Sequence, residues 1–202
     1  MKISKIEPQK KNKKRCSIYI DGEFKFGLTK ELVLKYDLNE GDEITEEDIK
    51  NVLLEEEKHK IIQRAFKILH YRERSVRELR DRLMRIGFDN SLVDEVIAEL
   101  IADKTLDDER FARAFVNDYT SLKPKGNRFI LSELTRRGVA REIITNLLDT
   151  RDEGELIRNY IEKKASNLDM KNPKERQKLV RRLLTRGFTP DIVYDMIKKE
   201  EG

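Results

Sequence analysis

The side chains of this chain that are best placed to do chemistry are cationic. The stretch 72–87, RERSVRELRDRLMRIG, holds six arginines in sixteen residues, and further basic clusters occupy KPKGNR at 123–128 and the segment 174–186. Clustered arginine and lysine side chains bind phosphates and carboxylates. The chemistry that these residues indicate is therefore recognition of a polyanion, either a nucleic-acid backbone or an acidic protein surface.

Residues that could serve catalysis or hold a metal do not form a recognisable pattern. His59 and His70 lie eleven residues apart without a partner at zinc-ligand spacing. The acidic run 107–109 stands where a helix should begin, and acidic side chains cap such positions. Cys16 has no general base near it, and there is no glycine-rich phosphate loop. We expect no catalytic residues, no metal site, no cofactor and no enzymatic activity.

The composition bounds the architecture and the location. Of 202 residues 41% are charged and 38% apolar, and 43 basic residues against 39 acidic ones leave a net charge of +4. Such a chain can bury only small cores, so we expect several small modules. One cysteine, no apolar run of membrane-spanning length and no signal-peptide pattern favour a cytoplasmic protein without a membrane contact.

An internal repeat positions the basic clusters. Gly87, Gly138 and Gly187 are spaced 51 and 49 residues apart, and each follows a basic amphipathic run. Apolar residues recur eight and four positions before each glycine, and five, six, nine and ten positions after it. In the first copy these are Leu79, Leu83, Leu92, Val93, Val96 and Ile97. Repeats of this length are typical of tandem helical modules.

The elements follow from local signals. CSIYIDGEFKFGL predicts a hairpin turning at Asp21-Gly22, and helix starts are indicated at Ser75 with Glu78, at Asp107, at Asp152 and at two proline-marked positions in the third copy. We expect a mainly α protein: three tandem three-helix repeats in an elongated curved stack, with a small N-terminal segment that contains a β-hairpin. The expected domains are 1–54, 55–104, 105–150 and 151–202.

Some arginines in 72–87 can be held by neighbouring acids. Four-residue spacing allows Asp81 to pair with Arg77 and Arg85, and Glu78 with Arg82. Arg80 has no acidic partner at that spacing, and Arg72 and Arg74 lie in the loop that enters the helix, so these three can face an anion. Corresponding places in the other modules are again basic, which predicts a basic stripe along one side of the stack. The candidate binding residues are Arg72, Arg74, Arg80, Lys123, Lys125, Arg128, Arg136, Arg137, Arg181 and Arg182. The alternative is a merely solvated face.

A helix-turn-helix interpretation of residues 76–100 fits the sequence less well. The second helix of that pair would carry Asp94, Glu95 and Glu99. Carboxylates are repelled by the phosphates that flank the major groove, which argues against sequence-specific DNA reading.

The motifs resemble a known family. AFKILHYRERSVRELRDRLMRIGF, LDDERFARAFV and KPKGNRFILSELTRRGV are similar to the bacterial regulatory RecX family over residues 60–202, with the third module least similar. The resemblance implies a non-enzymatic protein that lies in the groove of RecA filaments on single-stranded DNA, and we expect it to be a monomer. It implies inhibition of strand exchange, ATP hydrolysis and co-protease activity, hence modulation of DNA repair and the SOS response, and direct DNA binding by some members. The alternative is a general nucleic-acid-binding helical module without a RecA partner.

Overall fold

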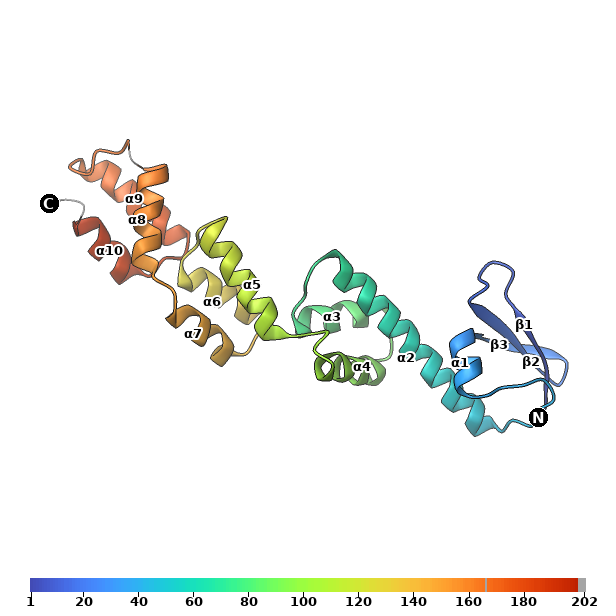
Figure 1. The fold of residues 1–202 in the computed structure, drawn as a ribbon. Helices are drawn as coiled ribbons and strands as arrows, with labels where there is room; N and C mark the ends of the chain where they lie inside the picture. Colours follow the sequence, from blue (N-terminus) through green and yellow to red (C-terminus); the bar gives the residue numbers. More distant parts are fainter. Residues whose placement is uncertain (166, 200–202) are drawn as a thin grey trace. The chain divides into compact units, whose positions relative to one another are not determined.

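A computed structural model describes residues 1–165 and 167–199 of the protein and is mostly helical (Figure 1). The N-terminal elements are β1 (Ile3–Pro8), β2 (Arg15–Ile20), β3 (Glu23–Thr29) and α1 (Lys30–Lys35). The helices that follow are α2 (Glu46–Tyr71), α3 (Val76–Ile86), α4 (Asn90–Ala102), α5 (Asp108–Ser121), α6 (Asn127–Arg136), α7 (Arg141–Asp149), α8 (Glu153–Lys164), α9 (Pro173–Thr185) and α10 (Pro190–Lys199). Residues 1–71 with 83–98 form one compact unit, and residues 72–82 with the chain from 99 onward form a second.

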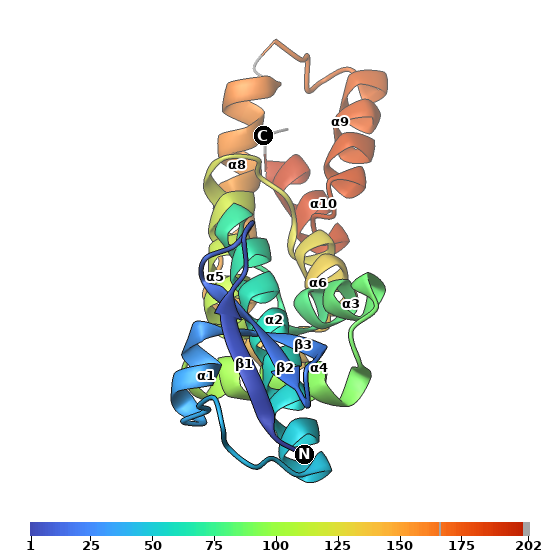
Figure 2. The ribbon, with the colours of Figure 1, turned by 90° about the vertical axis from the view of Figure 1, so that its right-hand side faces the viewer.

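The N-terminal segment is a three-stranded antiparallel sheet in the order β1-β2-β3 (Figure 2). Asp21 and Gly22 have positive φ angles of 51° and 87°, so the hairpin turns where it was predicted to turn. The strand β1 was not predicted, because only Ile3 and Ile6 are apolar in its six residues. Ile3 is nevertheless fully buried, and pairing with β2 explains why so polar a segment is a strand.

One face of the sheet packs on helices of the first unit. Cys16, Ile18 and Ile20 alternate along β2 and are buried with Leu28 and Val52. The cysteine is therefore part of an apolar core, as its position on a predicted strand suggested.

A buried carboxylate ties α2 to the sheet. Glu56 is 1% exposed; its carboxylate lies 2.5 Å from Nη1 of Arg15 and accepts the Thr29 N–H at 2.9 Å. Because α2 runs continuously from Glu46 to Tyr71, the expected domain boundary at 54/55 falls inside a helix. The acidic stretch before residue 57 thus contributes a structural side chain to the N-terminal segment.

The repeated apolar positions are the cores of the helical modules. Leu79 and Leu83 of α3, Ile130 and Leu134 of α6, and Leu179 and Leu183 of α9 are all fully buried. Two of the cores are formed by α5–α7 and by α8–α10. Gly87, Gly138 and Gly187 have positive φ angles of 100°, 81° and 82°, as expected of glycines that end helices. The prediction of three helical repeats from the glycine spacing is confirmed.

The helix starts also agree with the sequence. Asp107, Asp152 and Asn172 each accept a backbone N–H from the first turn of α5, α8 and α9. No helix among residues 1–165 and 167–199 is long and apolar enough to span a membrane.

Candidate anion-binding surface

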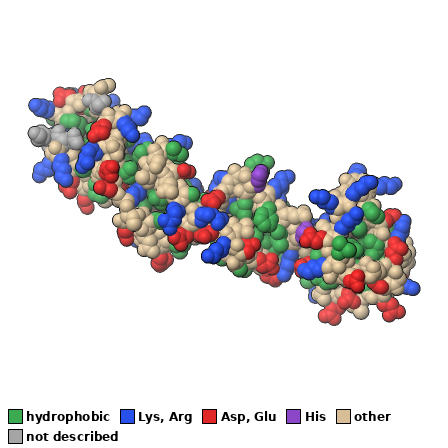
Figure 3. All heavy atoms as spheres, viewed as in Figure 1, with side chains coloured by type: hydrophobic (Ala, Val, Ile, Leu, Met, Phe, Trp, Pro, Cys, Tyr) green, Lys and Arg blue, Asp and Glu red, His purple; other side chains and the backbone are tan. Residues whose placement is uncertain are grey.

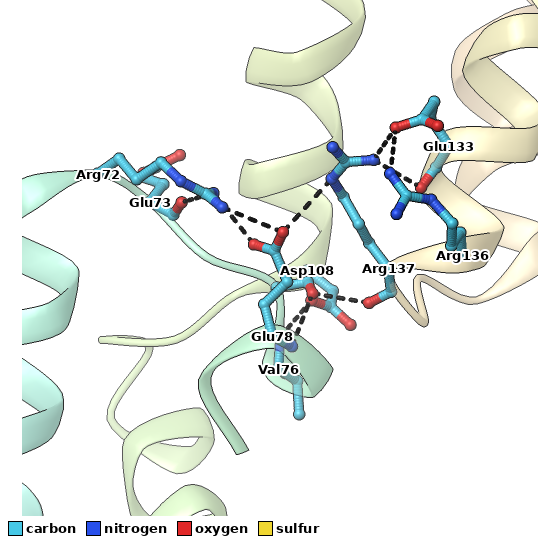
Figure 4. Close-up of polar contacts among 9 residues, drawn as sticks. Arg72, Glu73, Val76, Glu78, Asp108, Glu133, Arg136 and Arg137 are labelled. Atoms are coloured by element: carbon cyan, nitrogen blue, oxygen red, sulfur yellow. Dashed lines mark hydrogen bonds and ion pairs between the residues drawn. The ribbon is translucent and has the colours of Figure 1, made fainter. Parts of the chain in front are cut away.

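Three of the candidate basic residues, Arg72, Arg136 and Arg137, lie at a junction within the second unit, where the start of α3 meets α5 and the end of α6 (Figure 4). Ser75 donates from Oγ to the carbonyl oxygen of Arg137 at 2.7 Å, and Oγ also accepts the Glu78 N–H at 3.2 Å. The Val76 N–H donates to Oδ1 of Asp108 at 2.8 Å. The first turn of α3 is therefore capped both by its own serine and by the following module.

The same arrangement recurs between α6, α8 and the end of α9. Gly126 takes the place of Ser75, and its N–H donates to the carbonyl oxygen of Arg186 at 3.1 Å. The Asn127 N–H donates to Oε1 of Glu153 at 2.6 Å, as Val76 does to Asp108. Asp108 and Glu153 are the first residues of α5 and α8. An acidic residue that opens each module thus caps the second helix of the preceding one.

Glycines allow these two junctions to close. A Cβ on Gly138 would lie 2.7 Å from Cβ of Arg77, and one on Gly187 would lie 2.5 Å from Cβ of Phe129. A Cβ on Gly126 would overlap the backbone of Gly187 and Phe188. Close contact between modules requires a glycine at all three positions, and Gly138 and Gly187 also end helices with a positive φ.

Glu78 is the acidic centre of the first junction. Arg72 donates to both of its carboxylate oxygens, at 3.0 and 3.1 Å, and Nε of Arg137 lies 3.4 Å away. Arg137 also binds Glu133, together with Arg136, and its guanidinium lies 4.9 Å from the centroid of the Phe115 ring. Arg72, Arg136 and Arg137 are therefore held by acids of the fold (Figure 4).

This geometry corrects two of the ion-pair assignments. Glu78 was expected to pair with Arg82 and Arg72 to face an anion, whereas Arg72 binds Glu78. Glu78 lies in the first turn of α3, where its carboxylate faces the entering loop and the end of α6. The expected pair of Arg77 with Asp81 is present, with Nε and Oδ2 3.8 Å apart.

The pKa shifts of the three carboxylates at this junction differ in direction: the pKa is lowered for Glu78 and Glu133 and raised for Asp108. Burial raises the pKa of Glu78, but the hydrogen bonds and positive charge of Arg72 outweigh it, and the net pKa is lowered. Hydrogen bonds from Arg136 and Arg137 lower the pKa of Glu133. Burial raises the pKa of Asp108, although its bond from Val76 opposes the shift. The two arginine-bound carboxylates thus remain charged to lower pH than an ordinary glutamate.

Arg74 differs from its neighbours. It is half-buried, and its Nε is buried without a hydrogen-bond partner among the described residues. Burial lowers its pKa, and the nearby positive charge of Arg72 adds to this effect. An anion bound here would supply the acceptor that Nε lacks.

Two arginines outside the candidate binding set hold the second junction. Arg151 donates to Oγ1 of Thr120, to Oδ1 of Asn127 and to the carbonyl oxygens of Tyr119 and Lys125, at 2.6–2.9 Å. Arg186 donates twice to the Pro124 carbonyl oxygen, at 2.9 and 3.1 Å. Most of these acceptors are backbone atoms, which no residue pattern reveals. Only the recurrence of arginine before the third glycine, as in the second module, could have drawn attention to Arg186.

The remaining candidates are distributed around the second junction and along α3 and α9. Lys123, Arg128 and Arg181 are exposed, and their side chains form no hydrogen bond or ion pair within the described part of the chain. Lys125 lies with its ammonium 4.6 Å from the centroid of the Phe129 ring, while Arg80 and Arg182 are half-buried. On the face shown in Figure 3, lysine and arginine side chains are interspersed with acidic ones.

The described residues contain no group of three or more His, Cys, Asp or Glu side chains that could hold a metal ion. The run 107–109 acts as a helix start: Asp107 accepts the N–H groups of Glu109 and Arg110 at 2.8 and 3.0 Å.

Comparison with known families gives matches along most of the chain. The model of the regulatory protein RecX N-terminal domain matches residues 1–45. Models of the first, second and third three-helix domains of RecX match residues 62–100, 107–148 and 152–197. The resemblance drawn from the motifs is confirmed, and it extends to the N-terminal sheet.

Individual relatives agree. The regulatory protein RecX of Bacillus cytotoxicus is 33% identical over 204 residues, covering 95% of this chain and 74% of the relative. The regulatory protein RecX of Listeria monocytogenes is 30% identical over 197 residues, covering 95% and 73%.

Solved structures show the same fold. A crystal structure of regulatory protein RecX superposes with a TM-score of 0.77 and 27% identity over 98% of both chains. RecX from Lactobacillus salivarius covers 71% of this chain and 96% of its own, with a TM-score of 0.59 and 21% identity, which supports the fold alone.

Proposed function

Because this chain belongs to the RecX family of regulatory proteins, we propose that it binds the RecA filament on single-stranded DNA and inhibits the filament's recombinase, ATPase and co-protease activities. It would thereby modulate DNA repair and the SOS response. In this proposal the protein acts as a monomer, without catalysis or cofactor, and in the cytoplasm, where RecA and its DNA are found.

The observation that supports a binding role is the set of cations that the fold leaves unused. Lys123, Arg128 and Arg181 are exposed without a partner in the described chain, and Arg74 has an unsatisfied buried donor. Arg72, Arg136 and Arg137, by contrast, are occupied by Glu78 and Glu133. We therefore assign direct contact with the partner to Arg74, Lys123, Arg128 and Arg181. Arg72, Arg136 and Arg137 are assigned the role of positioning the modules.

The unused cations occur in more than one module, which suits an extended polyanionic partner. Each exposed contact is weak, about 1 kcal/mol or less, so affinity must come from several contacts made together. Binding of this kind should weaken as salt rises, because bound counterions are released from phosphates.

The test uses Arg128 and Arg181, two cations whose side chains form no hydrogen bond or ion pair with residues 1–165 and 167–199. Arg128→Glu with Arg181→Glu should leave the fold intact and reduce inhibition of RecA ATPase at least about tenfold, since each reversal removes one attraction and adds one repulsion. ATP hydrolysis by RecA on single-stranded DNA is measured against inhibitor concentration at moderate salt.

The matched control is the double variant Lys50→Glu with Lys67→Glu on α2. It makes the same change in net charge at exposed positions that lie far from residues 128 and 181 in the sequence. The control should inhibit like the unmodified chain. Equal inhibition by both double variants would show that the assigned cations are not the contact.

The alternative is a general nucleic-acid-binding helical module, favoured by the same cations, whose side chains have no partner among the residues that the structure describes. It predicts equal affinity for single-stranded DNA alone and for the filament, with a steep salt dependence. Tighter binding to the filament than to its DNA would exclude it.

A further inference from the structure

A hollow of about 410 Å³ lies within the second unit, between the end of α5 and α8. One wall is the segment 120–124, which leads from α5 toward α6, and the other is the face of α8 that carries Leu156, Asn159, Tyr160, Lys163 and Lys164. Arg186 completes the lining. We infer that this hollow binds a short acidic peptide segment of a protein partner, whose aliphatic side chain enters the hollow while its carboxylates meet the lysines.

The apolar part of the hollow is exposed on a hydrogen-bonded backbone segment. Leu122 is 75% exposed, although its N–H and that of Lys123 both donate to the Asp118 carbonyl oxygen, at 3.0 and 3.1 Å. Leu156 and Tyr160 are partly buried against the core of α8–α10. Covering the leucine with an aliphatic side chain would remove apolar surface from water without reordering the backbone.

The charge of the lining has one sign. Lys123, Lys163 and Lys164 are exposed and form no ion pair within the described residues, and no aspartate or glutamate lines the hollow. Three lysines around an apolar floor are complementary to carboxylates that flank an apolar residue.

A peptide fits this lining better than a nucleotide does. Bases stack on open aromatic faces, but the Arg186 guanidinium already lies 4.9 Å from the centroid of the Tyr160 ring. The other apolar residues, Leu122, Pro124 and Leu156, are not aromatic. Arg186 is also bound to the Pro124 carbonyl oxygen, so no free guanidinium in the lining could grip a phosphate in bidentate fashion.

This inference does not depend on RecA. Arg128 and Arg181, which test the proposed function, are absent from the lining, whereas Lys163 and Lys164 belong to it. Failure of peptide binding and failure of RecA inhibition are therefore separate results.

The experiment titrates the full chain with an acetylated, amidated peptide of sequence Glu-Asp-Leu-Leu-Asp-Glu to millimolar concentration and follows backbone amides by two-dimensional NMR. Saturable shifts are expected in residues 121–123 and 156–164. A peptide with Gln and Asn in place of the acids, and one with Ser in place of the leucines, should each bind at least about fivefold more weakly.

Variants locate the site. Lys163→Glu with Lys164→Glu should weaken the acidic peptide at least about fivefold, whereas Lys198→Glu with Lys199→Glu on α10 should not. The amide spectrum itself shows whether each variant is folded. The inference is overturned if the peptide leaves these amides unshifted, if the two variants bind alike, or if oligothymidylate shifts the same amides more strongly than the peptide does.

Discussion

Glu78 holds two arginines of the basic clusters in ion pairs within the fold. Its carboxylate is shared by Arg72 and Arg137, which come from the loop before α3 and the end of α6. From the sequence alone Glu78 seemed to serve Arg82, because helix spacing reveals only partners on the same helix. The partner 59 positions away could not be read from any local pattern.

The charge of Glu78 should make stability depend on pH. Its pKa is lowered from 4.5 in the folded chain, so its contribution is present above that value and is lost as pH falls through the folded pKa. Glu78→Gln should therefore cost about 1 kcal/mol at neutral pH and progressively less in acid. Urea unfolding of Glu78→Gln and of the unmodified protein, from neutral to acid pH, measures the difference between their free energies of unfolding. A cost that stays constant with pH would contradict the assigned ion pairs.

Arg151 is the residue whose loss should harm the fold most directly. Its guanidinium serves four acceptors around the α5–α6 linker, and a lysine cannot reach all of them. Arg151→Lys should lower the free energy of unfolding by about 2–4 kcal/mol, because acceptors are left unpaired. Arg158→Lys, at an exposed position of α8, is the control and should change the free energy of unfolding little. Similar unfolding midpoints for the two variants would refute the role of Arg151.

At the scale of elements, the repeat was the most informative part of the sequence. Apolar residues at fixed distances from Gly87, Gly138 and Gly187 predicted the buried faces of the helices because cores need such periodicity. The junctions were not predictable, since backbone carbonyl groups and N–H groups form most of their contacts. The strand β1 was missed for a related reason: it is stabilised by pairing with β2 more than by its own composition.

A substitution at Gly126 tests how closely the second junction is packed. Its φ of −77° is ordinary, so alanine would cause no backbone strain, but its Cβ would overlap the backbone at the end of α9. Gly126→Ala should destabilise the protein by about 1–3 kcal/mol.

The matched change is Gly154→Ala inside α8. A Cβ at that position would lie 3.2 Å from Oδ1 of Asp152, which accepts the Glu155 N–H at 2.9 Å and would have to shift by a few tenths of an ångström. Alanine offsets this shift because it favours a helix by about 0.5–1 kcal/mol. Thermal unfolding should place Gly154→Ala close to the unmodified protein and Gly126→Ala well below both. The reverse order would mean that the junction is looser than described.

At the scale of the whole molecule, the near balance of 43 basic and 39 acidic residues concealed two uses of positive charge. Some arginines join modules, and we propose that a second set of cations, Arg74, Lys123, Arg128 and Arg181, contacts the partner. The sequence could show where arginine and lysine recur, but only the contacts of Glu78, Glu133 and the linker carbonyl groups distinguish the two sets. The family relationship supplies the identity of the proposed partner.

We propose that the partner of this protein is the RecA filament and not DNA in general. The most direct measurement follows RecA ATPase on single-stranded DNA with increasing amounts of this protein, beside its binding to the same DNA without RecA. If the filament is the partner, RecA ATPase is inhibited at protein concentrations well below those that saturate the naked DNA. Unchanged ATPase, or inhibition that appears only where the DNA alone is already bound, would contradict it.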